Sequence, residues 1–448
     1  MQVFFESLGC DKNLVDSEVM LGLLRDAGYQ LTDDDREADV IVVNTCCFIG
    51  DAKEESIRTI LDLAQRKEDA RCRAIVATGC LAERYQGEIL TEIPELDAVL
   101  GTSSYDRLPE ILDELLEAEP ETHRRVFEPV DRLIETNTRR VLTTGGHYAY
   151  LKIAEGCDKH CSYCVIPSVR GRFRSYPMER LLEEARQLAE GGAAELILVA
   201  QETTLYGTDL YGRKMLGELL RQLAAIPEVR WLRVLYAYPE EIDGDLIRVM
   251  AEEPKVCHYL DMPVQSASDA VLRRMGRRTT AAELEKTVER LRSAVPDICL
   301  RTTLISGFPG ETDEDHAQTL DFLRRMRFDR LGVFPYSREE GTPAAKMKDQ
   351  IPKRIKMKRR GELMREQQRI AFEKAEEMIG RRLTVMVEGQ VPEEGICVTR
   401  TYMDAPDVDG YLFLEEDRQR LSGSFVPVTV TGAKGYDLIG RAEDEFAE

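Results

Sequence analysis

The sequence predicts an α/β protein built in three parts, and three observations support this interpretation. Strand and helix patterns alternate through residues 1–100, and a second alternation with six strand patterns runs through residues 148–336. A tail after residue 376 carries mostly short strand patterns. Such alternation is typical of parallel sheets, because consecutive parallel strands need a crossover long enough for a helix. We therefore expect three domains, over residues 1–120, 140–372 and 376–445.

The composition is that of a globular protein in a reducing compartment. The chain has 448 residues, of which 43% are hydrophobic and 32% charged, enough for several packed cores. It has no apolar run of about 18 residues and no basic, cleavable leader, so we expect a cytoplasmic protein without a membrane span. The 11 cysteines then indicate metal ligation rather than disulfides. The net charge of −21 favours a basic partner over nucleic acid.

Residues 1–100 predict a flavodoxin-like parallel sheet. Residues 3–5 form a first strand pattern, and residues 40–43 and 74–77 are continuous apolar runs, as expected of strands buried on both faces. Apolar residues at helical spacing lie between them, over 15–24 and 57–64. The carboxyl ends of these strands should therefore lie at one edge of the sheet, where ligands bind in such folds.

Each of these three strands is followed by a cysteine, namely Cys10, Cys46 and Cys80. Converging at one sheet edge, they would form a three-thiolate site assembled from distant residues. The alternative is that they are separate buried cysteines of an ordinary flavodoxin-like fold. Cys47 adjoins Cys46, but side chains alternate along a strand, so only one of the pair can face the site. We favour Cys46, which directly follows Asn44-Thr45.

Residues 140–372 predict a partial βα barrel. Amphipathic helices separate six strand patterns, at residues 148–154, 195–200, 231–237, 258–264, 298–305 and 330–336. Six units fall short of the eight of a full βα barrel. Reactive residues of such barrels lie after the strand ends, and a cysteine cluster follows the first strand here.

That cluster is Cys157, Cys161 and Cys164, spaced C-x3-C-x2-C. A closed zinc site needs four ligands, whereas three thiolates suit a 4Fe–4S cluster that keeps one iron open. The alternatives are three structural thiols or a zinc site completed from elsewhere. The other four cysteines are most simply structural: Cys72, Cys257, Cys299 and Cys397.

The C-x3-C-x2-C spacing resembles the signature of the radical S-adenosylmethionine (SAM) enzymes, which use a six-strand partial barrel. In that family the open iron binds SAM, and the reduced cluster cleaves SAM to a 5′-deoxyadenosyl radical. The resemblance implies that loops after the barrel strands hold SAM, and any single residue there could equally be an ordinary polar loop residue. The candidate contacts are Tyr163, Gln201, Gln265, Arg301, Gly307 and Gly310.

The tail resembles the TRAM domain, a small β-barrel that often binds RNA. Residues 381–448 carry 14 acidic and seven basic residues, a net charge of −7. A face that binds phosphates needs the opposite sign. We therefore expect this tail to contact a basic protein, with Asp404, Asp407 and Asp409 as candidate contacts.

Together the three parts resemble the methylthiotransferases over essentially the whole chain. These enzymes carry two 4Fe–4S clusters, one implied here at Cys10, Cys46 and Cys80, and insert a methylthio group at an unactivated C–H bond. Residues 7–13, 336–342 and 405–410 look like the branch that modifies the β-carbon of an aspartate in small-subunit ribosomal protein S twelve. Gln265-Ser266 departs from that branch and matches the one that modifies adenosine in transfer RNA.

The resemblance implies a basic ribosomal protein as substrate and an electron donor such as flavodoxin or ferredoxin, while the acidic tail argues against transfer RNA. No residue beyond the cluster ligands is expected to act as a conventional acid or base, and the chain has only five histidines. Two alternatives remain open. One is the transfer RNA methylthiotransferase, and the other is a non-catalytic iron–sulfur protein.

Overall fold

A computed structural model describes the chain except for residues 118–122, 137, 392, 394, 416–417 and 444–448. The expected domain ends at residues 120 and 445 lie outside the described part. So do six acidic residues of the tail: Glu394, Glu416, Asp417, Asp444, Glu445 and Glu448.

The chain divides into two compact units, each assembled from separate stretches. The first unit comprises Met1–Thr143, Ala154–Ser175 and Ser337–Ala345. The second unit comprises Thr144–Ile153, Tyr176–Tyr336 and Lys346–Glu448. The C-x3-C-x2-C stretch therefore belongs to the same unit as the N-terminal cysteines, although the barrel strands around it belong to the other.

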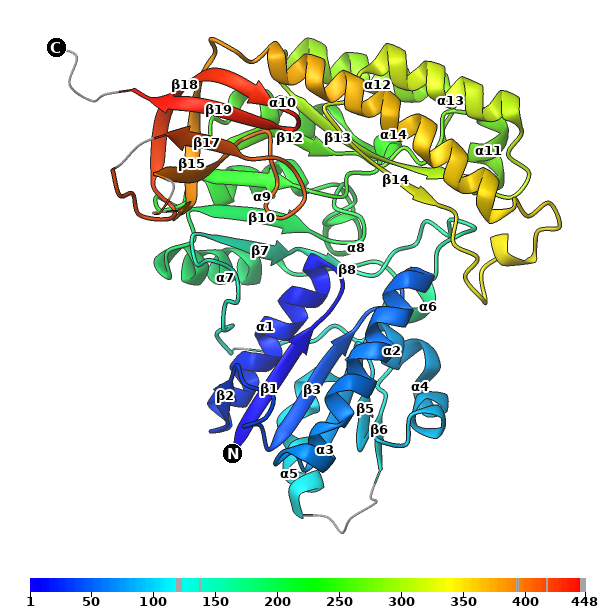
Figure 1. Cartoon of the computed structure of the whole chain (residues 1–448), viewed down its shortest axis with the longest axis vertical. Helices are drawn as coiled ribbons and strands as arrows, with labels where there is room; N and C mark the ends of the chain where they lie inside the picture. Colours follow the sequence, from blue (N-terminus) through cyan, green and yellow to red (C-terminus); the bar gives the residue numbers. More distant parts are fainter. Residues whose placement is uncertain (118–122, 137, 392, 394, 416–417, 444–448) are drawn as a thin grey trace. The chain divides into compact units, whose positions relative to one another are not determined.

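The first unit contains an all-parallel sheet in the order β2-β1-β3-β4-β5-β6, which confirms the predicted flavodoxin-like sheet (Figure 1). Its strands are β1 Gln2–Ser7, β2 Gln30–Thr32, β3 Val40–Thr45, β4 Ala74–Gly79, β5 Ala98–Leu100 and β6 Arg124–Val126. Its helices are α1 Asp11–Asp26, α2 Gly50–Ala64, α3 Arg66–Asp69, α4 Cys80–Glu92, η1 Tyr105–Arg107 and α5 Leu108–Glu117.

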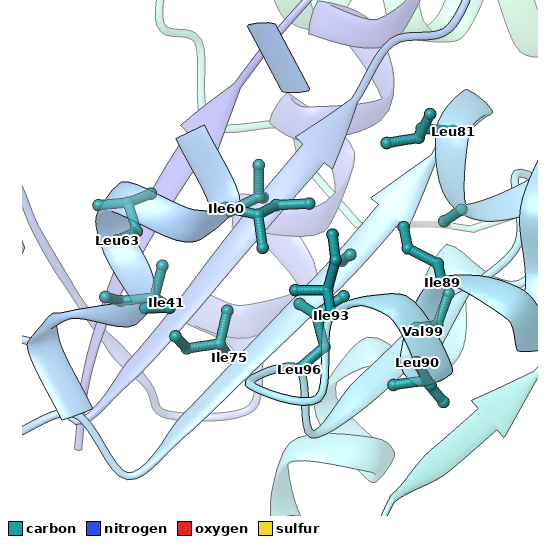
Figure 2. Close-up of a cluster of buried hydrophobic side chains, with 14 of the residues drawn as sticks. Ile41, Ile60, Leu63, Ile75, Leu81, Ile89, Leu90, Ile93, Leu96 and Val99 are labelled. Atoms are coloured by element: carbon teal, nitrogen blue, oxygen red, sulfur yellow. The ribbon is translucent and has the colours of Figure 1, made fainter. Parts of the chain in front are cut away.

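Helices cover both faces of this sheet because its central strands are apolar on both sides. Ile41 and Val43 of β3 pack with α2 and α4, whereas Val40 and Val42 pack with α1 and α5. Figure 2 shows the first of these clusters, in which Ile41 lies among aliphatic side chains of β4 and the two helices. Each such side chain contributes about 1.5–3 kcal/mol when fully buried.

The first unit also contains the loop that carries the cysteine triple. Strands β8 Ala154–Glu155 and β9 Arg174–Ser175 pair antiparallel and close this loop at its base. Within the loop, α6 spans Ile166–Arg170.

The second unit contains a six-stranded parallel sheet in the order β14-β13-β12-β11-β10-β7, so each strand lies beside its neighbour in the chain (Figure 1). This confirms the predicted partial βα barrel. The strands are β7 Tyr148–Lys152, β10 Glu195–Val199, β11 Trp231–Val234, β12 Val256–Asp261, β13 Cys299–Ser306 and β14 Arg330–Pro335. The largest shift from prediction is at β12, which ends at Asp261, before the proline at 263 that cannot donate to a ladder.

Several barrel helices begin at residues whose side chains cap the helix. For example, Thr312 and Asp315 form a capping box at the start of α13, which satisfies backbone donors that the helix itself leaves free. The helical elements of this unit are α7 Met178–Glu190, α8 Thr208–Tyr211, α9 Leu216–Ala224, η2 Pro239–Glu241, α10 Gly244–Glu252, α11 Asp269–Arg274, α12 Ala281–Ala294, α13 Asp313–Met326 and α14 Lys353–Glu376, while η3 Ala344–Lys346 crosses the unit boundary. Among the described residues, no helix is long and apolar enough to cross a membrane.

The C-terminal part of the second unit is a closed barrel in the order β15-β16-β17-β19-β18, the predicted TRAM-like architecture. Its strands are β15 Arg382–Val391, β16 Ile396–Thr401, β17 Leu412–Glu415, β18 Phe425–Lys434 and β19 Asp437–Ala442. Inward-facing apolar residues of all five strands form its core.

Buried charges join this small barrel to the βα barrel. Glu195, the first residue of β10, accepts hydrogen bonds from Arg400 of β16 at 2.5 Å and from Arg233 of β11 at 2.7 Å. All three side chains are 0% exposed. Nearby charges keep the pKa of Glu195 below its usual value even though burial alone would raise it, so this carboxylate stays charged.

The expectation that Asp404 and Asp409 contact a basic partner is wrong, because both are committed within the chain. Asp404 pairs with Arg330 at the start of β14. Asp409 accepts a hydrogen bond from Tyr259 at 2.7 Å and lies 3.6 Å from Arg301. Asp407 is exposed, although it accepts a hydrogen bond from Tyr148 at 3.2 Å. Carboxylates of the tail thus neutralise arginines of the βα barrel, which a count of charges along the sequence does not reveal.

We expect Arg400→Met to destabilise the protein by about 3–5 kcal/mol, because it leaves Glu195 with one cation fewer in a buried site. Chemical unfolding followed by circular dichroism measures the change. The matched control is Arg382→Met in the same small barrel, since Arg382 is exposed and pairs only with Glu443. Such a surface pair contributes about 0–1 kcal/mol. Equal effects of the two substitutions would show that the buried network does not stabilise the junction.

Candidate functional site

The C-x3-C-x2-C residues lie close together in the loop between β8 and α6. The backbone N–H of Cys164 donates to the carbonyl of Cys161 at 3.0 Å, and the Sγ of Cys164 accepts from the N–H of Ile166 at 3.4 Å. Burial raises the pKa of Cys164, and the neighbouring Cys161 and Cys157 raise it further. The three sulfurs are therefore within electrostatic reach of one another.

A glycine makes this loop possible. Gly156 precedes Cys157 and has a φ of 76°, a conformation that residues with a Cβ rarely adopt. A Cβ at this position would lie 2.0 Å from the carbonyl oxygen of Arg172. The close approach lets the N–H of Cys157 donate to the carbonyl of Gly171 at 3.1 Å, so the start and end of the loop hold each other.

The N-terminal cysteines also meet, at the carboxyl edge of the first sheet. Cys10 precedes α1 and is exposed, Cys46 follows β3, and Cys80 begins α4 directly after β4. Burial raises the pKa values of Cys46 and Cys80. The charge of Cys10 adds to both shifts, and that of Cys47 adds to the shift of Cys80. The structure thus brings together the three cysteines that sequence reasoning grouped.

Asn13 and Asn44 hold the loops that carry these cysteines. The amide nitrogen of Asn13 donates to the carbonyls of Leu8 at 3.0 Å and Thr45 at 2.9 Å, which joins the loop before Cys10 to the end of β3. The amide of Asn44 in turn donates to the carbonyl of Asn13 at 2.9 Å. Sequence reasoning did not assign these two asparagines a role; a polar residue at the end of an apolar strand was the available signal.

Cys46 and Cys47 lie in the loop after β3, which ends at Thr45, and they have different surroundings. Cys46 lies against Gly9, where an added Cβ would be 2.8 Å from the Cβ of Cys46. Cys47 is fully buried in the aliphatic cluster of Figure 2, and its thiol donates to the carbonyl of Cys80 at 3.2 Å. Burial raises the pKa of the Cys47 thiol to about 11.

The donor sets fit iron–sulfur clusters chemically. Within the described residues, no three or more Cys, His, Asp or Glu side chains surround one point closely enough to hold a single metal ion. A cluster makes a different demand, since each thiolate ligates its own iron. Each cysteine set offers three thiols in a partly enclosed loop region, which matches that demand.

One arginine contacts the surroundings of both cysteine sets. Arg170 ends α6, six residues after Cys164, and is only 1% exposed. Its Nε donates to the Sγ of Cys80 at 3.3 Å, and its Nη1 to Asp16 at 2.6 Å. Its Nη2 donates to the side-chain oxygen of Asn13. Sequence reasoning missed Arg170, and a lone arginine in a short helix offers no local signal.

The segment Ser337–Ala345 completes the first unit. Glu339 is buried, and its carboxylate lies 2.9 Å from both Arg84 of α4 and Lys53 of α2. The N–H of Ala344 donates to the carbonyl of Ser162, which lies between Cys161 and Cys164. This segment therefore contacts the cysteine loop through Ala344 and the helices α2 and α4 through Glu339.

Known proteins resemble the chain over its whole length. A ribosomal protein uS12 methylthiotransferase RimO of Lachnoclostridium phytofermentans is 61% identical over 443 residues, which cover 99% of this chain and 100% of that protein. The chain belongs to the RimO family. The methylthiotransferase resemblance inferred from the sequence is thereby confirmed. A second RimO, of Geobacter sulfurreducens, is 50% identical and covers 98% of each chain.

Each part of this RimO-family chain also matches a family of its own. Residues 2–101 match the Uncharacterized protein family UPF0004, residues 151–323 the Radical SAM superfamily and residues 379–442 the TRAM domain. SAM and 4Fe–4S clusters are accordingly its cofactors.

Solved structures share the fold at low sequence identity. The radical SAM methyltransferase TsrM from Kitasatospora setae aligns with a TM-score of 0.55 and 16% identity, over 94% of this chain and 81% of that one. The cobalamin-dependent radical SAM enzyme OxsB aligns with a TM-score of 0.52 and 15% identity, over 81% of this chain and 56% of that one.

The structure separates the candidate SAM contacts of this RimO-family chain between its units. Tyr163 lies in the cysteine loop of the first unit. Gln201, Gln265, Arg301, Gly307 and Gly310 lie in the second unit, at or after the barrel strands.

The glycines in this set have the backbone freedom that a close approach needs. Gly307 and Gly310 have φ values of 69° and 77°, and the N–H of Gly307 donates to the carboxylate of Glu311 at 3.1 Å. Gln265 also has a positive φ, of 70°. Arg301 already pairs with Asp261 at 3.1 Å, so this arginine has a carboxylate partner within the chain.

The choice of Cys46 over Cys47 stays a prediction. We expect Cys46→Ala to lose the N-terminal cluster and methylthiolation while keeping reductive SAM cleavage, because it faces Cys10 rather than the core. Cys47→Ala is the control and should retain the cluster, at a modest stability cost for a buried thiol. Iron analysis and deoxyadenosine assays of both variants distinguish the two, and the reverse pattern would show that Cys47 is the ligand.

Proposed function

We propose that this chain transfers a methylthio group to the β-carbon of an aspartate in ribosomal protein uS12. One observation carries the proposal: eight relatives at 46–61% identity have the name ribosomal protein uS12 methylthiotransferase, and this chain aligns with them over at least 97% of its length. An alignment of that length includes all three parts of the chain. The sequence motifs at residues 7–13, 336–342 and 405–410 support the same branch.

We propose Cys157, Cys161 and Cys164 as ligands of a radical-generating cluster, and Cys10, Cys46 and Cys80 as ligands of an auxiliary cluster. With SAM bound, the two clusters would supply a carbon radical and the sulfur that is transferred. The cysteine triples leave one iron of each cluster without a protein ligand, which suits a cluster that must bind a reactant. The domains proposed from the sequence, over residues 1–120, 140–372 and 376–445, place one cluster site in each of the first two domains, although both cysteine sets belong to the first compact unit.

An aspartate β-hydrogen is too weakly acidic for a side-chain base to remove at neutral pH, so the proposed chemistry needs a radical. The histidines support this reading. His147, His258 and His316 have carboxylate partners at 2.6–2.7 Å, namely Glu388, Asp297 and Glu362. In each of these three residues, one ring nitrogen is therefore hydrogen-bonded to a carboxylate of the chain itself.

For SAM we propose contacts from Tyr163, Gln201, Gln265, Gly307 and Gly310. The positive φ values of Gly307 and Gly310 support a close backbone approach there. Arg301 remains a proposed SAM contact, but in a different role. Because it pairs with Asp261 and lies near Asp409, it would act on SAM as part of that charged group rather than alone.

We also propose flavodoxin or ferredoxin as the electron donor, because reductive cleavage of SAM consumes an electron that amino-acid side chains do not supply. Transfer RNA is the alternative substrate, and Gln265-Ser266 is the feature that favours it. The net charge of −21 opposes binding of a polyanion and supports attraction of a basic ribosomal protein.

The two-cluster assignment is tested by changing Cys157, Cys161 and Cys164 together to alanine. We expect this variant to keep about four irons per chain, as one 4Fe–4S cluster requires. Wild type should bind twice that amount. Iron and sulfide analysis with Mössbauer spectroscopy makes the measurement. A variant without iron, beside a wild type with a single cluster, would contradict the assignment.

The substrate is tested by offering reconstituted enzyme, SAM and reductant both uS12 and transfer RNA, with mass spectrometry of each. We expect methylthiolation of the uS12 aspartate and none of adenosine. Binding of uS12 should weaken as salt rises, since opposite net charges attract the two proteins. The triple alanine variant is the control without radical chemistry. Modified adenosine with an unmodified aspartate would show that Gln265-Ser266 was the better guide, and a chain that cannot cleave SAM would favour a non-catalytic iron–sulfur protein.

A further inference from the structure

Arg170 is the side chain on which this inference rests. It is a buried arginine whose helix α6 begins directly after the C-x3-C-x2-C loop, while its guanidinium lies among residues of the N-terminal cysteine site. Its Nε donates to the sulfur of Cys80, a proposed auxiliary ligand, at 3.3 Å. The inference therefore depends on the proposed function and goes further by giving Arg170 a role.

The guanidinium is held in place on its other edges. Its Nη1 lies 2.6 Å from Asp16 of α1 and 3.2 Å from Glu155 of β8, and its Nη2 donates to the side-chain oxygen of Asn13. A buried guanidinium needs such partners, because an unpaired charge costs several kcal/mol. The planar guanidinium of arginine has N–H donors on Nε, Nη1 and Nη2. With both Nη atoms bonded to these partners, Nε is the donor directed at the sulfur.

These partners come from both sides of the site. Asp16 and Asn13 lie on α1, which starts at Cys10, while Glu155 lies two residues before Cys157. Arg170 thus ties the loop of one cysteine triple to the helix and strand ends that carry the other. With one cation and two carboxylates, the buried group bears a net charge of −1 apart from the thiol.

A hydrogen bond to a ligating sulfur stabilises the electron-rich, reduced state of a cluster and so raises its reduction potential. We propose that Arg170 is a positioning residue for the auxiliary cluster. It raises the reduction potential of that cluster through Cys80, and it fixes the loop of Cys157, Cys161 and Cys164 relative to Cys80. Both effects come from one fork-shaped side chain, which a lysine cannot reproduce.

The test compares reduction potentials in the full-length Cys157→Ala, Cys161→Ala, Cys164→Ala chain, which is expected to hold the auxiliary cluster alone. Two further changes are made separately in this parent. Arg170→Lys keeps the charge and loses the directed N–H at sulfur. Arg170→Met with Asp16→Asn removes a cation and a carboxylate together, so the net charge of the group stays −1 and Glu155 is the carboxylate that loses its ion pair with Arg170.

We expect both variants to retain iron and to show about a tenfold shift of the reduction equilibrium toward the oxidised state. For a one-electron couple this is about 59 mV toward more negative potential. Redox titration monitored by electron paramagnetic resonance measures it. The matched control is Arg84→Lys, since Arg84 is also buried, pairs with Glu339 and donates to the carbonyl of Cys47 rather than to a proposed ligand sulfur. Its potential should equal that of the parent.

In the holoenzyme with both cysteine triples intact, Arg170→Lys should also lower the methylthio product formed per deoxyadenosine released. Unchanged potentials in both Arg170 variants with iron retained would overturn the proposal. So would unfolding of both variants, because Arg170 would then be a general stabiliser of the fold. If the chain with the three alanines holds no iron, the ligand assignment is wrong and this proposal fails with it. If that chain holds its cluster and the reduction potentials of the Arg170 variants equal its own, only the role of Arg170 is wrong.

Discussion

The carboxyl ends of parallel strands share one edge of a sheet, and the cysteine chemistry of the first unit depends on that constraint. Cys46 and Cys80 are adjacent because β3 and β4 pair in register, from Val40 with Ala74 to Thr45 with Gly79. Cys10 joins them because β1 pairs with β3 on the other side. After β3, Cys46 lies against Gly9 and Cys47 lies in the aliphatic core.

Both units use the same device to join distant segments: a buried arginine that is neutralised by carboxylates from elsewhere in the chain. In the first unit this residue is Arg170, with Asp16 and Glu155, and in the second it is Arg400, with Glu195. Removing one partner from such a group leaves an uncompensated buried charge, which costs far more than loss of a surface pair. Buried arginine–carboxylate groups therefore hold the segments that they join in a narrow range of positions. Such a constraint suits loops that are proposed to bind cofactors.

The sequence predicts the individual domains of this protein better than the contacts that join distant segments. Apolar periodicity is local, so β1, β3 and β4 of the first sheet, the six strands of the second sheet and the cysteines after them could be placed from the sequence alone. The three-residue strands β2, β5 and β6 are too short for such a pattern and were not predicted. Arg170 and Glu339 could not be placed either, because their partners lie tens to hundreds of residues away and an ion pair has no periodic pattern. Asp404 and Asp409 were misjudged for the same reason. A sum of charges along the tail treats every carboxylate as available to a partner protein, whereas these two lie against arginines of the βα barrel.

The edges of the partial barrel explain why the units interleave. A six-stranded sheet that does not close has two edge strands, here β7 and β14. The chain enters the first unit soon after each of them, through Ala154–Ser175 after β7 and through Ser337–Ala345 after β14. These two stretches meet where Ala344 donates to Ser162, so the cysteine loop is connected to both edges of the barrel sheet through the backbone.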